Sequence, residues 1–382
     1  MKSPHHKSLP RLLIIQPVMK GYRLPFFHGL SERLAAAGVA LEVAYGTPWA
    51  EEAKRGDNVE LPPPLGRKVE SRMLGGKLLW LPAFDAVAAA SHVIVEHANK
   101  NAINYPLALA NALGVKRVAY WGHGRDRQSD PSSGGERFKR ASLHWADWWF
   151  AYTGGAAAYV AEQGFAPGRI TTVGNAIDTR QLREQVASVT PAERESLLAG
   201  LGLAADGPRL VYCGSLYANK RLDLMLPAID AVQARLPALQ LIVIGGGPLA
   251  DEVRRFAEAR PWVRYVGPKF GREKAALLSL AALWLNPGLV GLGVLDAFSA
   301  GLPLITCEAS YHSPEIEYLE HGGNGLVLPA DVAALSAALG DLLAAPDRLA
   351  ALQQGARAAA ERHSIEAMID NFAQGVGKWL NV

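Results

Sequence analysis

A lysine and a glycine-rich loop in the second half of the sequence have the residue types that hold a phosphorylated ligand. Lys220 lies in GSLYANKRLD, between an apolar run and a helical stretch. At the start of a helix the backbone N–H groups and the helix dipole attract an anion, and a lysine adds a point charge for a phosphate. Gly245 and Gly246 follow another apolar run, and glycines let a backbone approach a ligand closely. The alternatives are a solvated surface lysine and a purely structural tight turn.

The stretch NPGLVGLGVLDAFSAGLPLIT, residues 286–306, is the most specific of these patterns. An apolar run ends in it, a loop with three glycines follows, and a helix is expected to begin near Gly293. The bare N–H groups of Gly291, Leu292 and Gly293 would hold a diphosphate or sugar hydroxyls. Asp296, in the first turns of that helix, would accept two hydrogen bonds from a ribose diol. The alternative for Asp296 is a carboxylate that only interacts with the helix dipole.

Polar side chains also follow apolar runs in the first half of the chain. His123 lies in WGHG and could donate or accept a hydrogen bond in a cleft, or it could be a structural histidine that caps its loop. Comparable loops contain His97, Lys100, Arg125 and Arg127. Arginines there could touch an acceptor phosphate, although surface arginines are the commoner case. The cluster of Trp145, Trp148 and Trp149 indicates core packing rather than a platform for stacking sugars.

Strand-like apolar runs alternate with helical stretches along the whole chain, which predicts α/β architecture with parallel, doubly wound sheets. The runs of the first half are 12–18, 41–46, 92–97, 117–124 and 148–154. After a polar helical stretch the runs are 209–216, 239–247, 263–267, 282–288, 302–308 and 324–329. We therefore predict two Rossmann-like domains facing a cleft, residues 1–180 and 181–365, and a terminal helix, 366–382, that crosses back to the first domain. Ligands bind at the carboxyl ends of parallel strands, which is where the polar loops lie.

The composition is that of a globular protein, with 382 residues, 49% hydrophobic and 20% charged. No run of about 18 apolar residues occurs, and LLIIQPV near the start is too short for a signal peptide, so we expect a cytoplasmic protein. Residues 1–180 hold 22 Lys+Arg against 15 Asp+Glu, or +7, whereas residues 181–382 hold 17 against 21, or −4, in a total of +3. A basic first half suits the cytoplasmic face of the inner membrane or an anionic, lipid-linked acceptor, with ordinary surface charge as the alternative. Cys213 and Cys307 are expected to be buried free thiols.

The second half of the chain resembles glycosyltransferase family 4, whose members share the GT-B fold. The resemblance covers residues 209–329 and rests on the order of five motifs: GSLYANKRLD, GGGPL, VRYVGPKFGREKAALLSLAALWLNPG, GLGVLDAFSAGLPLIT and HSPEIEYLEHGGNGLVL. The first half matches more loosely, with QPVMKGYRLPFF similar to the family's first strand and glycine loop, AYWGHG to its histidine loop, and VGNAIDT to the segment before its linker.

The resemblance implies roles for individual residues. Lys220 would bind the donor diphosphate, and Asp296 would replace the second glutamate of the family's E-x7-E motif, which holds the nucleotide ribose. Glu315 would face the donor sugar, and His123 would lie near the sugar and the acceptor. The remaining candidates are Gly21, Ser215, Gly245, Gly246, Gly291, Leu292 and Gly293 for the donor, and Arg23, His97 and Arg125 for the acceptor. Gly21 would let the donor phosphate or the acceptor come close.

Two positions depart from the family pattern. The first glutamate of E-x7-E falls at Gly288, and the arginine that often assists the diphosphate lysine falls at Ser215. Sugar contacts would then come from the backbone of residues 289–293 or from Glu315. A Pro-Gly-x-Val-Gly-Leu version of this loop occurs in family members that resemble bacterial surface-polysaccharide transferases.

The resemblance implies a retaining transferase that moves a sugar from a nucleotide-diphosphate sugar to a saccharide acceptor. The preferred acceptor is lipid-linked, in cell-surface polysaccharide or lipopolysaccharide synthesis. No Asp-x-Asp motif or carboxylate cluster stands out, so we expect neither a metal nor another cofactor. We also expect no nucleic-acid partner. The alternatives are a sugar-nucleotide 2-epimerase of the same fold, a catalytically inactive nucleotide-sugar-binding partner, and a two-lobed sugar-binding protein, which usually carries a secretion signal.

Overall fold

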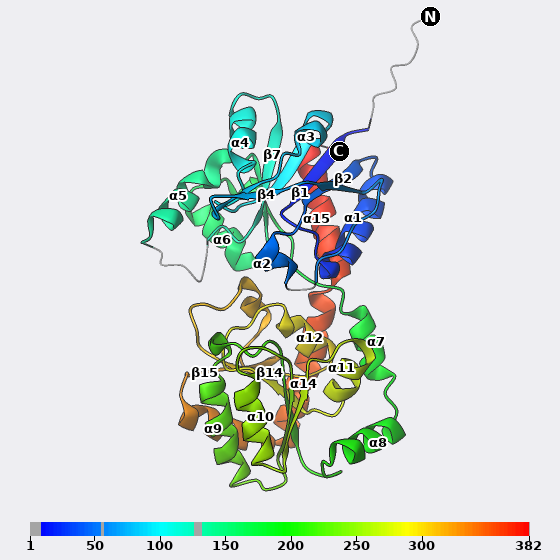
Figure 1. Cartoon of the computed structure of the whole chain (residues 1–382), viewed down its shortest axis with the longest axis vertical. Helices are drawn as coiled ribbons and strands as arrows, with labels where there is room; N and C mark the ends of the chain where they lie inside the picture. Colours follow the sequence, from blue (N-terminus) through cyan, green and yellow to red (C-terminus); the bar gives the residue numbers. More distant parts are fainter. Residues whose placement is uncertain (1–8, 55–56, 126–131, 382) are drawn as a thin grey trace, which may run out of the picture. The chain divides into compact units, whose positions relative to one another are not determined.

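The computed structural model describes residues 9–54, 57–125 and 132–381 (Figure 1). The chain divides into two compact units, Met1–Asp178 with Ile365–Val382, and Thr179–Ser364. Each unit contains one parallel sheet with helices connecting its strands, as the alternation of apolar runs and helical stretches predicts.

The first unit is built on a seven-stranded sheet with the strand order β3-β2-β1-β6-β7-β8-β9, in which every neighbouring pair is parallel. Its strands are β1 (Arg11–Gln16), β2 (Ala40–Gly46), β3 (Gly66–Val69), β6 (His92–Glu96), β7 (Arg117–Gly122), β8 (Trp148–Ala151) and β9 (Ile170–Thr172). Its helices are α1 (Leu24–Ala36), α2 (Ala50–Ala53), α3 (Phe84–Ala89), α4 (Asn104–Ala112), α5 (Gly134–Ser142), α6 (Gly154–Glu162) and α15 (Ile365–Leu380). A separate antiparallel pair joins β4 (Arg72–Leu74) and β5 (Leu78–Trp80).

Burial explains why the inner strands read as unbroken apolar runs. Leu12, Leu13 and Ile14 of β1 are at most 1% exposed. Successive side chains of a strand point to opposite faces, so burial of consecutive residues requires both faces of the sheet to be covered. Trp149 of β8 is also fully buried, which confirms core packing for that member of the tryptophan cluster.

The last helix of the chain packs into the first unit. α15 contacts α1 and β9, and Figure 1 shows it in red beside α1. Phe372 of α15 stacks on Phe150 of β8 with ring centroids 4.4 Å apart. The buried face of α15 repeats at helical spacing of three or four residues and consists of Ile365, Met368, Phe372, Gly375, Val376 and Trp379.

The second unit is built on a six-stranded parallel sheet with the strand order β12-β11-β10-β13-β14-β15. Its strands are β10 (Arg209–Cys213), β11 (Gln240–Ile244), β12 (Val263–Gly267), β13 (Leu283–Leu285), β14 (Leu304–Cys307) and β15 (Gly325–Leu328). Its helices are α7 (Arg180–Ala187), α8 (Pro191–Leu201), α9 (Leu222–Gln233), α10 (Ala250–Glu258), α11 (Gly271–Leu278), α12 (Gly293–Ser299), α13 (Val332–Leu343) and α14 (Pro346–Arg362). α8 begins at a capping box of Thr190 and Glu193 and ends at Gly202, where φ is +61°.

The predicted fold class is confirmed, because both sheets are parallel and alternate with helices. The sequence did not predict β3, β9 or the β4–β5 pair, which are three or four residues long and too short to show a clear apolar period. Both cysteines are free thiols. Among the residues that the structure describes, no helix is both long and apolar enough to cross a bilayer.

Candidate functional site

Three loops meet at the carboxyl edge of the second sheet. They follow β10, β11 and β13, which are adjacent in the order β11-β10-β13, and in open parallel sheets this edge is where ligands bind. The first two loops touch at Gly245, where the Cβ of any other residue would lie 1.8 Å from the carbonyl oxygen of Gly214. The carbonyl of Gly246 accepts a hydrogen bond of 2.9 Å from the N–H of Leu216. Gly245 therefore lets the two loops pack closely, and the carbonyl of Gly246 joins them, whether or not either residue also touches a ligand.

Lys220 is held within this group of loops rather than solvated at the surface. It ends the 3-10 helix η4 (Ala218–Lys220), and its Nζ donates a hydrogen bond to the carbonyl of Leu289. Asn286 donates to the same carbonyl through Nδ2 at 3.2 Å. Burial lowers the pKa of Lys220 to about 8. The lysine is therefore still protonated at neutral pH, and an ammonium has three donors, of which this carbonyl uses one.

Gly288, at the position of the missing glutamate, packs directly on the backbone that carries Lys220. A Cβ at this position would lie 2.2 Å from the carbonyl oxygen of Asn219 and 2.5 Å from the Cα of Lys220. The N–H of Leu289 donates to that same carbonyl of Asn219 at 2.8 Å. The loop after β13 thus adopts a path that no side chain at residue 288 can share.

Asp296 in α12 is paired with a lysine that the sequence analysis missed. The Nζ of Lys274 in α11 lies 2.6 Å from Oδ2 of Asp296, and both side chains are 20% exposed. Burial opposes the charge on Lys274, but the Asp296 carboxylate outweighs it and raises the pKa of the lysine. The ion pair fixes the direction of the Asp296 carboxylate, which a role on the helix dipole alone does not require. Lys274 lies within one of the five motifs, but the motif did not single it out, because it is one of several charged residues in GREK.

The loop after β14 is tied to the loop after β13 by His312. Its Nδ1 accepts a hydrogen bond of 3.0 Å from the N–H of Val290, and its Nε2 donates to the carbonyl of Cys307 at 2.8 Å. The N–H of Ser313 donates to the carbonyl of Val290 at 2.9 Å. Glu315, in the 3-10 helix η5 (Pro314–Tyr318), follows directly and is 4% exposed. The HSPE segment was noted in the sequence, but the anchoring role of its histidine was not.

The remaining donor candidates of the second unit lie in the same loops. Ser215 is exposed, and its carbonyl accepts a hydrogen bond of 2.7 Å from the Tyr212 hydroxyl. Gly291, Leu292 and Gly293 form the turn that opens α12, where the N–H of Val294 donates to the carbonyl of Gly291 at 3.1 Å. The structure therefore gathers the donor candidates of this unit into one group of loops.

The candidates in the first unit separate into buried and exposed groups. Arg23 is 6% exposed, with Nη1 donating to Oδ1 of Asn175 at 3.0 Å and the guanidinium 4.7 Å from the ring centroid of Trp121. His123 follows β7, and its ring stacks on Tyr152 with centroids 5.5 Å apart. Arg125 is exposed and lies over the Tyr159 ring at 5.0 Å. Gly21 donates its N–H to the carbonyl of Asp57, and a Cβ there would make only ordinary contacts. Arg127 lies outside the described residues.

His97 does not fit the expected contact with an acceptor. Its side chain is in the core, 6% exposed, with ring centroids 4.7 Å from Tyr120 and 5.0 Å from Trp149. Nε2 shares a hydrogen bond of 3.0 Å with the Ser142 hydroxyl. Burial lowers the pKa of His97 to about 3, so the ring is neutral at physiological pH. The loop position suggested exposure, but the ring turns inward between two large aromatic side chains.

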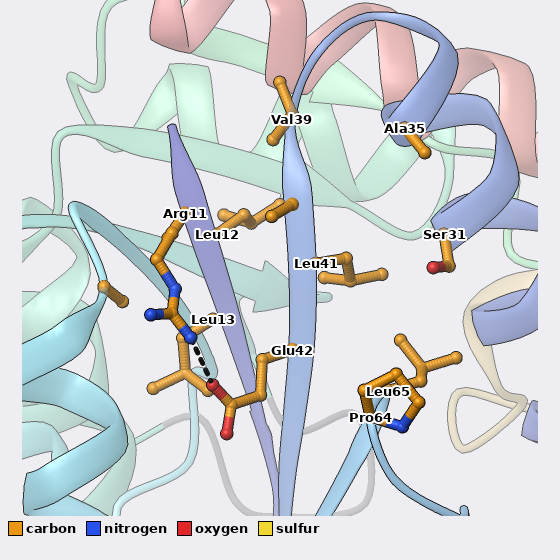
Figure 2. Close-up of a pocket in the computed structure, with 12 residues that line it drawn as sticks. Arg11, Leu12, Leu13, Ser31, Ala35, Val39, Leu41, Glu42, Pro64 and Leu65 are labelled. Carbon is orange, nitrogen blue, oxygen red and sulfur yellow. Dashed lines mark ion pairs between the residues drawn. The ribbon is translucent and has the colours of Figure 1, made fainter. Parts of the chain in front are cut away.

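A cavity of about 320 Å³ lies in the first unit, at the edge of the sheet that the amino ends of its strands form (Figure 2). It is lined by the first residues of β1 and β2 and by Pro64 and Leu65, and Figure 2 shows Arg11 and Glu42 pointing toward each other. The ion pair between them measures 3.6 Å. The cavity is at the amino ends of the strands, away from the edge where ligands of parallel sheets bind.

Comparison with known proteins gives the family. Residues 26–181 match a model described as Glycosyltransferase Family 4, and residues 207–345 match one described as Glycosyl transferases group 1. A GDP-mannose-dependent alpha-(1-6)-phosphatidylinositol monomannoside mannosyltransferase from Mycolicibacterium smegmatis is 30% identical over 167 residues, 40% of this chain and 42% of that protein. The matched segment is therefore less than half of that relative's length.

Two solved structures are similar to the whole chain. HepE of Anabaena, in complex with UDP, has a TM-score of 0.68 at 14% identity, covering 97% of this chain and 100% of that one. A Listeria monocytogenes protein assigned as a UDP-N-acetylglucosamine 2-epimerase has a TM-score of 0.64 at 14% identity, covering 97% and 96%. At these identities the likeness shows the fold alone. The solved structures therefore show the GT-B fold, and the two family matches, which follow one another along the chain, show that it belongs to the glycosyltransferases of group 1 and family 4.

Proposed function

We propose that the chain transfers a glycosyl group from a nucleotide-diphosphate sugar to a saccharide acceptor, with retention of configuration and without a metal ion. The observation that carries the proposal is the half-buried ammonium of Lys220 beside the loop after β13, in the same unit as the Lys274–Asp296 pair. The name of the Mycolicibacterium relative specifies GDP-mannose, and HepE was crystallised with UDP, so nucleotide sugars fit both comparisons. A lipid-linked acceptor in surface-polysaccharide synthesis at the inner membrane is the finer part of the proposal.

Charge stabilisation is the chemistry that these groups offer. The departing diphosphate gains negative charge as the glycosidic bond breaks, and a preorganised ammonium stabilises that charge. Asp296, held by Lys274, would accept hydrogen bonds from the ribose hydroxyls. Among the described residues, no group of three His, Cys, Asp or Glu side chains is placed to hold a metal ion. In the proposed mechanism, Lys220 and the backbone N–H groups of the loops carry the diphosphate.

A thermal-shift panel of nucleoside diphosphates and their sugars tests the proposal. A ligand at 100 times its dissociation constant stabilises the folded state by about 2.7 kcal/mol. We expect one base, presented as UDP, GDP or dTDP, to raise the melting temperature clearly more than the other two. Absence of any shift at millimolar concentrations would reject a nucleotide-sugar enzyme.

The epimerase alternative is favoured by one observation, the fold shared with the Listeria protein. An epimerase converts its sugar nucleotide without a second substrate, so incubation with the donor alone separates the two functions. Conversion of the sugar with donor alone would favour the epimerase. Tight nucleotide binding without turnover on any acceptor would favour an inactive binding partner.

Nucleotide binding is expected to weaken as the pH rises through about 8. The pKa of Lys220 is lowered to about 8 by burial, so the ammonium is present at pH 7 and is lost above pH 8 in the unliganded protein. Only the protonated form attracts the diphosphate, so the affinity should fall by up to about tenfold per pH unit above the pKa. Calorimetric titrations between pH 7 and pH 10 measure this slope.

Lys220→Arg is the control for the pH profile. Arginine stays charged over this range, so its profile should report only the titration of the nucleotide itself. Equal slopes in the wild type and in this variant would show that Lys220 does not contribute the titrating charge.

A further inference from the structure

Helix α4 of the first unit presents an uncharged face to the solvent. Its segment, residues 101–115, contains no Asp, Glu, Lys or Arg. Leu107 is 3% exposed and packs in the core. By contrast, Leu109, Leu113 and Val115 are 62%, 69% and 67% exposed. A surface helix ordinarily places charged side chains on its outer face, so large aliphatic side chains exposed at helical spacing indicate a face that a partner covers.

Three aromatic rings continue this face from α4 to α5. The ring centroid of Tyr105 in α4 lies 6.2 Å from that of Phe138 in α5 and 6.3 Å from that of Trp145. Phe138 and Trp145 are 5.5 Å apart, and both Tyr105 and Phe138 are exposed. The Tyr105 hydroxyl donates to the carbonyl of Asn99 at 2.8 Å. Tyrosine and tryptophan, with an apolar body and a polar tip, are typical of the level at which a bilayer meets water.

The side chains beside Phe138 on α5 are basic. Arg137 and Arg140 are exposed, and Lys139 lies between them in the sequence. Within the described part of the chain, none of these three cations forms an ion pair. The one carboxylate of the helix, Glu136, is 8% exposed and therefore contributes little negative charge to the surface. A group of cations without counter-ions attracts an anionic surface.

Charge separates the partners that this face could bind. A second copy of the chain, docked through the same face, would bring two sets of the same cations together, so electrostatics disfavours that symmetric dimer. A nucleic acid would pair with the cations but would leave the aliphatic side chains in water. An anionic bilayer satisfies both parts, because its headgroups pair with the arginines and its acyl region takes up the leucines.

We infer that α4 and α5 form a membrane-docking face that binds the surface of an anionic lipid bilayer. The inference rests on the inner-membrane part of the proposed function and deepens it, because it names the surface that makes the contact. This face consists of Tyr105, Leu109, Leu113, Val115, Arg137, Phe138 and Arg140.

The exposure of α4 indicates how the face enters the bilayer. With nine residues the helix is far too short to span a membrane, so it lies in the interface. The exposed fraction rises along it from 37% at Tyr105 to 69% at Leu113. The carboxyl end of α4 therefore inserts most deeply, while Tyr105 and the arginines of α5 stay at the level of the headgroups.

Sedimentation of the full-length protein with lipid vesicles tests the inference. Vesicles of phosphatidylcholine alone are compared with vesicles of an equal mixture of phosphatidylcholine and phosphatidylglycerol. We expect clear binding to the mixed vesicles and much weaker binding to the neutral ones. Added salt should weaken binding to the mixed vesicles, because the Debye length falls from about 8 Å at physiological ionic strength to about 3 Å at 1 M.

Two double variants separate the contributions of charge and apolar contact. Arg137→Gln with Arg140→Gln should weaken binding to the mixed vesicles about thirtyfold, because each cation near an anionic surface contributes about fivefold. Leu109→Ala with Leu113→Ala should weaken it about tenfold or more, because methylene groups that enter the acyl region are lost. Both leucines are mostly exposed, so alanine at these positions should leave the melting temperature unchanged.

Each double variant has a matched control outside the membrane-docking face. Arg194→Gln with Arg255→Gln makes the same change in net charge at two exposed arginines of the second unit. Leu9→Ala removes a leucine that is 59% exposed and lies near Gly38, just after α1. Both controls should bind the mixed vesicles like the wild type.

Three results would overturn the inference. The first is wild-type protein that binds neither kind of vesicle, or binds both equally. The second is unchanged vesicle binding in both double variants. The third is a dimer, seen by analytical ultracentrifugation, that Leu109→Ala with Leu113→Ala dissociates, because a second copy of the chain would then cover the face.

Nucleotide titrations on the same samples separate this inference from the proposed function. UDP and GDP are titrated into the wild type and both double variants. Nucleotide affinity that is unchanged while vesicle binding falls supports a docking face separate from the donor site. Failure of every nucleotide to bind the wild type would reject the donor assignment, whereas loss of vesicle binding alone overturns only the membrane-docking face.

Discussion

Replacing Lys220 with alanine is expected to lower donor turnover about a hundredfold or more, with little change in stability. The ammonium is half-buried, donates to the Leu289 carbonyl, and has donors left for a diphosphate. A charged contact that strengthens as the leaving group gains charge is worth about 2–4 kcal/mol in the transition state, which corresponds to roughly a hundredfold or more in rate. Release of nucleoside diphosphate from the donor that the thermal-shift panel identifies measures the effect.

The matched control for Lys220→Ala is Lys269→Ala in the same unit. Lys269 is bonded to Glu273 at 3.3 Å on the surface, and exposed pairs of this kind contribute about 0–1 kcal/mol. Its loss should leave turnover within about twofold of the wild type. Near-wild-type turnover in Lys220→Ala would remove the lysine from the donor site, whereas a lowered melting temperature with normal turnover per folded molecule would assign it a purely structural role.

Much of the fold could be predicted because the pattern is repeated and strong. Unbroken apolar runs such as those of β1 and β11 are typical of strands buried on both faces, and their alternation with helices fixes a parallel sheet. Short elements escaped for the opposite reason. β9 has three residues, ITT, none of them fully buried, and its place at the sheet edge depends on pairing with β8. Which two segments pair depends on the folded arrangement of the chain, and a prediction from the spacing of apolar residues within one segment does not include it.

The sequence predicted those site residues that lie in glycine-containing loops directly after strands. It did not predict those that reach the site from other elements through side-chain packing. Lys220 and Gly245 follow strands in glycine-containing loops, and the adjacency of those strands brings the loops together. Lys274 reaches Asp296 from α11, and His312 holds the loop after β13 from the loop after β14. The number of residues between each of these side chains and its partner follows neither the helical nor the strand repeat, so the sequence pattern does not predict these contacts. His97 shows the converse error, since a loop position indicated exposure while the ring packs in the core.

Gly288 gives the second large effect, because restoring the family's glutamate there is expected to damage the protein. The resemblance alone suggests that Gly288→Glu would add a sugar-binding carboxylate. The structure indicates the opposite. The first side-chain carbon would lie 2.2 Å from the carbonyl oxygen of Asn219 and 2.3 Å from the carbonyl carbon of Lys220, and both contacts are backbone atoms that cannot rotate away. We expect both Gly288→Glu and Gly288→Ala to destabilise the second unit by about 3 kcal/mol or to displace the loop that carries Lys220.

Gly288→Ala adds a side-chain carbon without a charge, so it separates the effect of steric overlap from the effect of the carboxylate. Gly340 lies within helix α13 of the same unit, and a Cβ there meets no atom within 4 Å, so Gly340→Ala should be neutral or slightly stabilising, by up to about 1 kcal/mol. Melting temperatures and nucleotide titrations of the three variants decide the matter. If steric overlap governs, Gly288→Ala loses stability or nucleotide affinity nearly as fully as Gly288→Glu, while Gly340→Ala loses neither. If Gly288→Glu instead binds the donor more tightly and turns it over faster, the loop can move aside, and the close approach of Gly288 to Lys220 is not what excludes the carboxylate from this enzyme.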